Sequence, residues 1–260
     1  MNIWGKIIGG AAGFALGGPL GALLGALAGH AVDRHVEGET PAIAGPDGQQ
    51  GGGTGAGTDD RAATRQIAFT IAVIALGAKM AKADGQVSRS EVAAFKEVFQ
   101  VPANETANVA RVFDLAKRDA RGFEPYAKQV ARMFRKGHPV LEELLDGLFH
   151  IARADGRVHE SELAYLAEVA RLFGFTEADF ARIREANVGP DKADPYTILG
   201  VRREMSNEEI RAAWRKLVRD NHPDRLIAQG LPEELVTLAN QKLATINAAY
   251  DKVAKERGIS

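Results

Sequence analysis

The stretch Asn207-Glu-Glu-Ile-Arg-Ala-Ala-Trp-Arg-Lys-Leu-Val-Arg-Asp220 is followed by His222-Pro-Asp224, and this combination decides how the C-terminal part of the chain folds. Ser206 and Glu209 have the spacing of a capping box, which opens a helix. That helix carries an apolar face with the spacing of a buried stripe. The apolar face consists of Ile210, Trp214, Leu217 and Val218.

Basic side chains recur on another face of this helix. They are Arg211, Arg215, Lys216 and Arg219. The helix should end near Asn221, because the residue before a proline avoids the α region. A second apolar stripe follows, formed by Leu235, Leu238, Ala239, Leu243, Ile246, Tyr250 and Val253. Two antiparallel helices packed on these stripes would hold His222-Pro-Asp224 at an exposed tip.

Taken singly, a basic row is typical of a solvated helix face, and His-Pro-Asp is typical of a proline turn. In this order, and with Ala248-Ala-Tyr250 at the end of the second helix, they resemble the J domain of the DnaJ (Hsp40) co-chaperones. The resemblance implies that His222, Pro223 and Asp224 dock on an Hsp70 of the DnaK type and stimulate its ATP hydrolysis. It also implies that Arg211, Arg215, Lys216 and Arg219 steer the domain toward an acidic Hsp70 surface.

Composition narrows the class of protein. The chain has 260 residues, a formal net charge of −1 and no cysteine. The length leaves room for one or two domains, and the balanced charge predicts no nucleic-acid partner. The lack of cysteine excludes disulfides and suits the cytosol. We expect no enzyme activity, no catalytic residue, no cofactor and no metal, since one His and one Asp are too few ligands and no nucleophile stands near them.

Residues 1–32 are predicted to form a transmembrane anchor. No charged side chain occurs from Ile7 to Gly29, and such a length can span a bilayer. Small residues every fourth position let membrane helices approach closely, so we predict a homodimer through this segment. The glycines proposed for that contact are Gly9, Gly13, Gly17, Gly21, Gly25 and Gly29.

Three other interpretations of this segment stay open. It could be a cleaved signal peptide, with Lys6 in the n-region and Ala26-Leu-Ala28 as the cleavage site. It could be a soluble helical hairpin broken at Gly17-Gly-Pro19, or a glycine-rich segment that inserts poorly. As an anchor it would be single-pass in the bacterial inner membrane. Its short N-terminus would be periplasmic and the rest of the chain cytoplasmic, where the Hsp70 works.

The middle of the chain, residues 62–188, contains an internal repeat and follows a flexible Gly/Pro linker at 33–61. Ala81-Lys-Ala-Asp-Gly-Gln-Val-Ser-Arg-Ser-Glu91 matches Ala152-Arg-Ala-Asp-Gly-Arg-Val-His-Glu-Ser-Glu162. Each copy lies between two apolar helical runs. The pattern resembles a TerB-like all-α domain. Its expected helices are 64–82, 88–100, 103–118, 123–136, 139–154, 159–173 and 177–187.

The repeated corners also match the second half of an EF-hand loop, but the ligands of the first half are missing. We therefore favour a tight turn in which Gly85 and Gly156 adopt an unusual backbone angle. Glu91 and Glu162 would then sit in a first helical turn.

The complete arrangement is an all-α chain: a membrane helix, a TerB-like bundle, and a J-domain helical hairpin at 194–260. It resembles the DjlA family of membrane-anchored DnaJ-like proteins. The most specific stretch runs from His222 to Glu233 and continues with Lys242 and Ile246-Asn-Ala-Ala-Tyr250. Here the Gly-rich tract precedes the TerB-like region, whereas the family more often has a flexible tract before the J domain. The competing hypothesis is a stress-response membrane scaffold that acts mainly through the TerB-like domain, with an accessory J domain.

Overall fold

The computed structural model describes residues 69–80, 89–98, 101, 103, 106–118, 122–187 and 193–259. These residues form helices and turns without a strand, which confirms the predicted all-α class. The predicted anchor and linker lie outside the described residues. No described helix is both long and apolar enough to cross a membrane.

Each helix predicted between residues 62 and 188 has a counterpart in the structure. After helix 69–80, the bundle consists of α5 (Arg89–Val98), α6 (Thr106–Arg118), α7 (Glu124–Ala131), α8 (Pro139–Ala152), α9 (Glu160–Phe173) and α10 (Glu177–Ala186). Helix α7 ends five residues before the predicted limit of 136, because the chain turns through 132–138 to reach Pro139 at the first position of α8.

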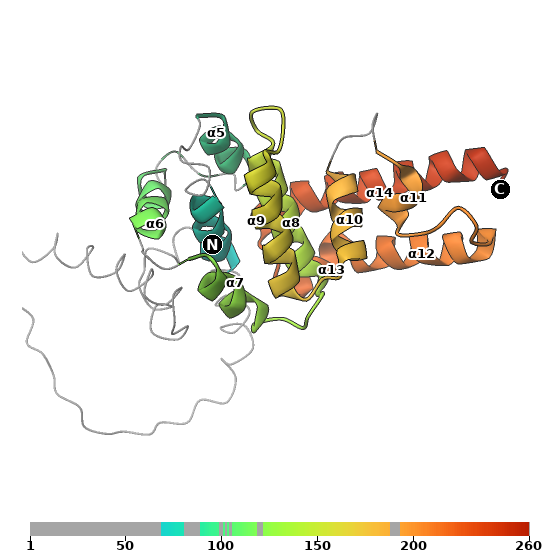
Figure 1. The fold of residues 1–260 in the computed structure, drawn as a ribbon, viewed down its shortest axis with the longest axis horizontal. Coiled ribbons are helices and arrows are strands. Elements are labelled where there is room, and N and C mark those ends of the chain that lie inside the picture. Colours follow the sequence, from blue (N-terminus) through green and yellow to red (C-terminus); the bar gives the residue numbers. More distant parts are fainter. Residues whose placement is uncertain are drawn as a thin grey trace, which may run out of the picture.

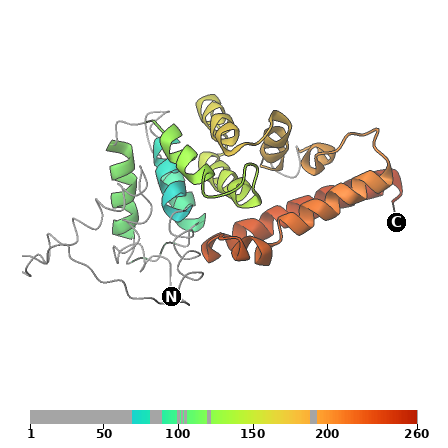
Figure 2. The same cartoon turned by 90° about the horizontal axis from the view of Figure 1, so that it is seen from below.

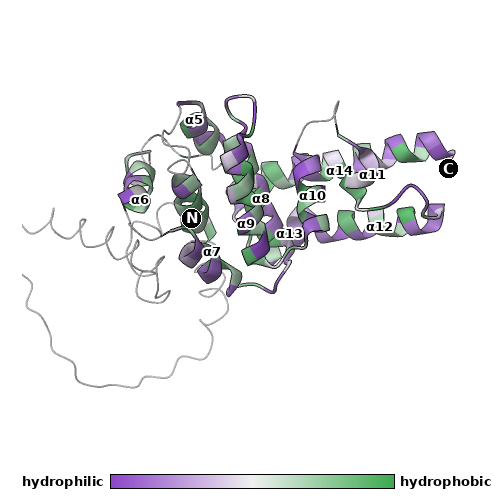
Figure 3. Ribbon diagram, in the orientation of Figure 1, coloured by the Kyte–Doolittle hydropathy of each residue, from purple (hydrophilic) through white to green (hydrophobic). Residues whose placement is uncertain are grey.

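Helix 69–80 and α8 form the centre of the bundle. Every residue of helix 69–80 is buried, and this helix carries mainly hydrophobic colours in Figure 3. Helix α8 is buried almost all round, as expected for a helix covered by neighbours on every side. The buried positions of α8 include the carboxylates of Glu142, Glu143 and Asp146. These acids need partners, because an isolated charge is very costly to bury.

The C-terminal unit, which we call the hairpin unit, begins with α11 (Pro195–Leu199) and α12 (Asn207–Asp220). It continues through α13 (Pro223–Ala228) and a 3-10 turn, η2 (Glu233–Leu235), into α14 (Val236–Arg257). Helices α12 and α14 run side by side (Figures 1 and 2). The Trp214 and Tyr250 rings stack between them with centroids 4.2 Å apart, and Trp214 Nε1 donates to Asn247 Oδ1 at 3.0 Å.

Local sequence signals define these helices as predicted. Asp194 caps α11 by accepting a hydrogen bond from the Thr197 N–H at 3.0 Å. Gly200 ends α11 with a φ of 65°. Ser206 and Glu209 form the capping box of α12, with N–H to side-chain distances of 2.8 and 3.2 Å.

The tip predicted for His222-Pro-Asp224 is wrong in one respect. The end of α12 that leads into this tripeptide lies against the bundle, while the opposite end of the hairpin, near the C-terminus, projects freely (Figure 1). Leu226 of α13, Leu231 and Leu235 are each at most 1 % exposed and belong to the core of the bundle. The tripeptide therefore sits where the two units meet.

The second apolar stripe is shared between two cores, which the sequence pattern did not predict. Ile246, Ala249 and Val253 pack in the hairpin unit against α11 and α12. Leu235 and Ala239, earlier on the same face, pack in the core of the bundle. Helix α14 thus belongs to both units and joins them along its length.

A buried ion cluster reinforces this junction. Lys242 of α14 places Nζ 2.7 Å from Glu142 Oε1, 3.0 Å from Glu143 Oε1 and 2.8 Å from Asp146 Oδ2. Arg182 of α10 makes a two-pronged contact with Glu142, at 2.9 and 2.6 Å. The cluster pairs the buried acids of α8 with cations from two other helices, although both Glu143 carboxylate oxygens, Asp146 Oδ2 and Lys242 Nζ form no hydrogen bond among the described residues.

Candidate functional site

His222 is the N-cap of α13 and Pro223 is its first residue. His222 Nδ1 accepts a hydrogen bond from the Asp224 N–H at 3.3 Å. In the neutral ring this places the proton on Nε2, which is then a donor. Burial of Pro223 holds the turn, while the side chains of His222 and Asp224 are 50 % and 89 % exposed. The pair thus presents a donor and a carboxylate to solvent from a fixed turn.

The four predicted basic residues of α12 have unequal settings. Arg215 is exposed, and the side chains of Lys216 and Arg219 are 70 % and 67 % exposed. Arg211 is half-buried, with Nε 3.4 Å from the Tyr250 hydroxyl. The structure therefore places three of the four on an open face, and the fourth along the seam with α14.

Asp220 organises the end of this basic face and was not singled out by sequence. Its carboxylate lies 3.0 Å from Lys216 Nζ, 3.8 Å from Arg219 Nε and 2.9 Å from Arg225 Nη1. Arg225 follows the His-Pro-Asp turn on α13, so Asp220 ties the basic helix to that turn. The spacing from Lys216 to Asp220 was the available signal, because residues four apart on a helix are neighbours.

The second repeated corner is a local turn, as predicted. Gly156 has a φ of 101°, and Glu162 Oε2 accepts a hydrogen bond from the His159 N–H at 2.8 Å at the start of α9. Asp155 contacts the N–H of Arg157 and the ring of His159. Within the described residues no cluster of His, Cys, Asp or Glu has the arrangement of a metal site. Gly85 lies outside them.

Comparison with known families follows the same division of the chain. Residues 70–185 match the family model described as tellurite resistance protein TerB. Residues 194–257 match the DnaJ domain, and residues 1–57 match the transmembrane domain of the co-chaperone DjlA.

Several relatives match the chain over nearly its full length. A co-chaperone protein DjlA of Photobacterium profundum is 32 % identical, with 98 % of this chain and 99 % of the relative covered. The protein of the same description from Vibrio cholerae is 32 % identical with both chains fully covered. The chain belongs to the DjlA family of co-chaperones. A DjlA from Shewanella oneidensis is 31 % identical over the full length of both chains. No solved structure matches.

Membership of the DjlA family establishes the class of protein and the identity of its two folded domains. The chain is a membrane-anchored co-chaperone with a TerB domain, which is the bundle, and a J domain, which is the hairpin unit. DjlA proteins are non-enzymatic J-domain proteins. The anchor residues matched by the transmembrane family model lie outside the described residues.

Proposed function

We propose that this chain recruits an Hsp70 of the DnaK type to the bacterial inner membrane and stimulates its ATP hydrolysis. One observation carries the proposal: a turn held by the buried Pro223 exposes His222 and Asp224 at the end of an exposed basic helix face. The chain contributes no catalytic group of its own. It shifts the conformational equilibrium of its partner by binding one state of it more tightly.

The basic residues of α12 and the His-Pro-Asp turn have different roles in binding Hsp70. Arg215, Lys216 and Arg219 accelerate encounter with an acidic Hsp70 surface through long-range attraction. His222 and Asp224 make the short contacts that couple docking to hydrolysis. Arg211 contributes mainly by holding Tyr250 at the seam of the hairpin.

The test is steady-state ATP hydrolysis by a DnaK-type Hsp70 with the full chain reconstituted in lipid nanodiscs. We expect stimulation by the wild type and none by His222→Gln or Asp224→Asn, with unchanged circular dichroism and melting. Because His222 also caps α13, the unchanged circular dichroism and melting are what exclude lost folding as the cause of lost stimulation. Full stimulation by His222→Gln would exclude the proposed mechanism.

We further propose that the chain is a single-pass dimer, with a periplasmic N-terminus and with residues 62–188 and 194–260 in the cytoplasm. The four-residue glycine spacing supports close helix packing in lipid, where burying leucine gains little. Gly21→Ile with Gly25→Ile should leave the protein in the membrane after alkaline carbonate extraction but weaken crosslinking. Crosslinking that ignores both substitutions would remove the glycine contact, and carbonate-soluble wild type would remove the anchor.

A further inference from the structure

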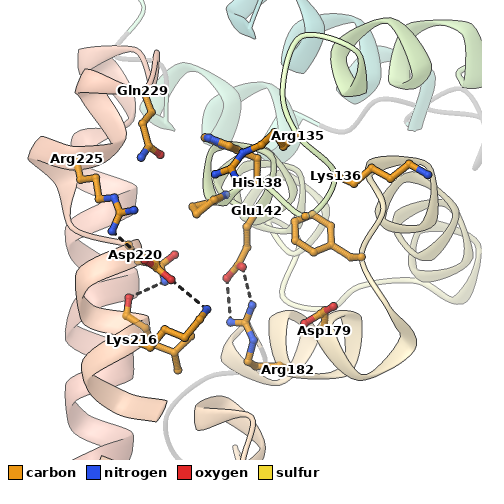
Figure 4. A pocket seen from close by; sticks show the side chains of 15 residues that line it. Arg135, Lys136, His138, Glu142, Asp179, Arg182, Lys216, Asp220, Arg225 and Gln229 are labelled. Atoms are coloured by element: carbon orange, nitrogen blue, oxygen red, sulfur yellow. Dashed lines mark hydrogen bonds and ion pairs between the residues drawn. The ribbon is translucent and has the colours of Figure 1, made fainter. Parts of the chain in front are cut away.

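A cleft of about 450 Å³ separates the J domain from the TerB domain beside the basic face. Lys216, Asp220 and Arg225 form one wall (Figure 4). Arg135 and Lys136, from the turn between α7 and α8, lie on the opposite side. Lys216 therefore belongs both to the face proposed to dock Hsp70 and to this cleft.

The wall formed by the TerB domain is fixed in place. The N–H of Gly137 donates to the carbonyl of Phe173 at 3.0 Å, which ties the turn to the end of α9. Gly174, with a φ of 84°, leaves room there, because an added Cβ would lie 2.6 Å from Lys136 Cβ. The ion pair between Lys242 of the J domain and Glu142 of the TerB domain holds the two domains together beside the cleft. The cleft is thus built before any partner arrives.

The charges along the cleft are unbalanced in favour of cations. Arg182 is paired with Glu142, and Asp220 is shared by Lys216 and Arg225. Arg135 and Lys136 are exposed, and neither forms an ion pair within the described residues. Asp179 is the remaining acid that lines the cleft, and no ion pair joins it to Arg135 or Lys136, so the cations stay in excess.

Two residues that line the same cleft have side-chain amide oxygens with unused hydrogen-bonding capacity. Asn221 is 2 % exposed, and its Oδ1 is buried without a hydrogen-bond partner among the described residues. The same holds for Oε1 of Gln229. Both residues line the cleft. Buried acceptors of this kind are rare unless something donates to them.

We propose that the cleft receives an acidic chain segment of the Hsp70 partner, so that Arg135 and Lys136 of the TerB domain dock Hsp70 together with Lys216. Carboxylates of the segment pair with the exposed cations, and its backbone N–H groups donate to the side-chain oxygens of Asn221 and Gln229, which turn toward the cleft when the segment binds. The inference deepens the proposed function and rests on it. It makes the TerB domain part of the docking surface rather than a spacer.

The test measures the affinity of a DnaK-type Hsp70 for the full chain in nanodiscs and compares the wild type with charge variants. Arg135→Glu with Lys136→Glu should raise Kd about three- to tenfold, mainly through slower association, and should reduce its dependence on salt. Arg135→Lys with Lys136→Arg keeps both charges and should bind like the wild type. Arg89→Glu with Arg118→Glu is the matched control, since both residues are exposed on α5 and α6, which line no part of the cleft.

The outcomes separate the cleft from the proposed function. If His222→Gln abolishes stimulation but Arg135→Glu with Lys136→Glu binds as tightly as the wild type, the cleft proposal is overturned and the function stands. Equal weakening by the Arg89 and Arg118 control would also overturn it, because only overall charge would matter. A wild-type chain that does not stimulate the Hsp70 would overturn both.

Discussion

Lys242 Nζ lies 2.7 Å from Glu142 Oε1, and this ion pair joins the long helix of the J domain to the central helix of the TerB domain. Burial opposes ionisation of Glu142, but Lys242 and Arg182 outweigh it and lower its pKa to about 2. Burial also opposes the charge on Lys242, yet Asp146, Glu142 and Glu143 together raise its pKa. Both partners therefore stay charged at neutral pH.

Removing the Lys242 side-chain charge should destabilise the junction between the two domains and with it the folded protein. Lys242→Met leaves several buried acids with Arg182 as the remaining cation, which we expect to cost about 3–5 kcal/mol. The melting midpoint should fall by roughly 10 °C. Lys255→Met, at an exposed position on the same helix, is the control and should melt like the wild type. A Lys242→Met protein as stable as that control would show that the cluster contributes no net stability.

Glu143 should make folding stability depend on pH with a sign opposite to that of an ordinary paired carboxylate. Burial raises its pKa to about 7, with Asp146 adding to the effect and Lys242 opposing it. Because the folded pKa lies above the usual 4.5, the folded state binds the proton more tightly. The contribution of protonated Glu143 to the free energy of unfolding is therefore present at low pH, and it is lost as the pH rises from about 4.5 to about 7.

Glu143→Gln mimics the protonated form and should flatten this dependence. Between pH 5 and 8 the wild type should lose up to about 3 kcal/mol relative to the variant. Urea unfolding of both proteins at the two pH values measures the difference. Glu160→Gln, at an exposed position on α9, should follow the wild-type profile. Parallel profiles for the wild type and Glu143→Gln would contradict the raised pKa.

Gly174 should tolerate no side chain. A Gly174→Ala change forces a Cβ to 2.6 Å from Lys136 Cβ at a φ of 84°, so we expect about 2–3 kcal/mol of destabilisation. Gly258→Ala has a comparable φ of 65° but nothing within 4 Å, and should cost only about 1 kcal/mol. Thermal melts of the two variants measure the steric part directly. Equal losses would mean that the turn at 132–138 moves aside freely.

The basic face of α12 should act on association rather than dissociation. Arg215→Glu with Lys216→Glu should slow Hsp70 association by about tenfold at low salt, and less at high salt, because screening weakens exposed charges. Stopped-flow binding at two ionic strengths separates the two rates. Wild-type association that ignores ionic strength would remove the steering role.

Features set by neighbouring residues were predictable from sequence. The caps at Asp194 and Ser206, the turn at Gly156 and the helix end before Pro223 follow from local hydrogen bonding and backbone preference. The short helix α13 was missed, since only its burial against the bundle stabilises so brief an apolar run.

Long-range pairing was not predictable in the same way. Glu142, Glu143 and Asp146 have the spacing of an ordinary charged helix face, and only the fold shows that this face is buried under Lys242. The apolar stripe of α14 is likewise continuous in sequence. Nothing in its period indicates that Ala239 and Ile246 enter different cores. The cleft between the domains could not be predicted either, because it depends on the same packing of α14 against the TerB domain.

Sharing α14 between two cores has a practical consequence for dissecting this protein. A recombinant fragment cut at the short connection before Asp194 would strip the cover from Leu226, Leu231 and Leu235, which are almost completely buried in the intact chain. Exposed leucines of this kind promote aggregation. A J domain grafted from another co-chaperone would need matching leucines to seat on the bundle. The smallest unit that can be transplanted is therefore the pair of domains. A short connection divides them in the sequence, but they share one continuous packed interface in the folded molecule.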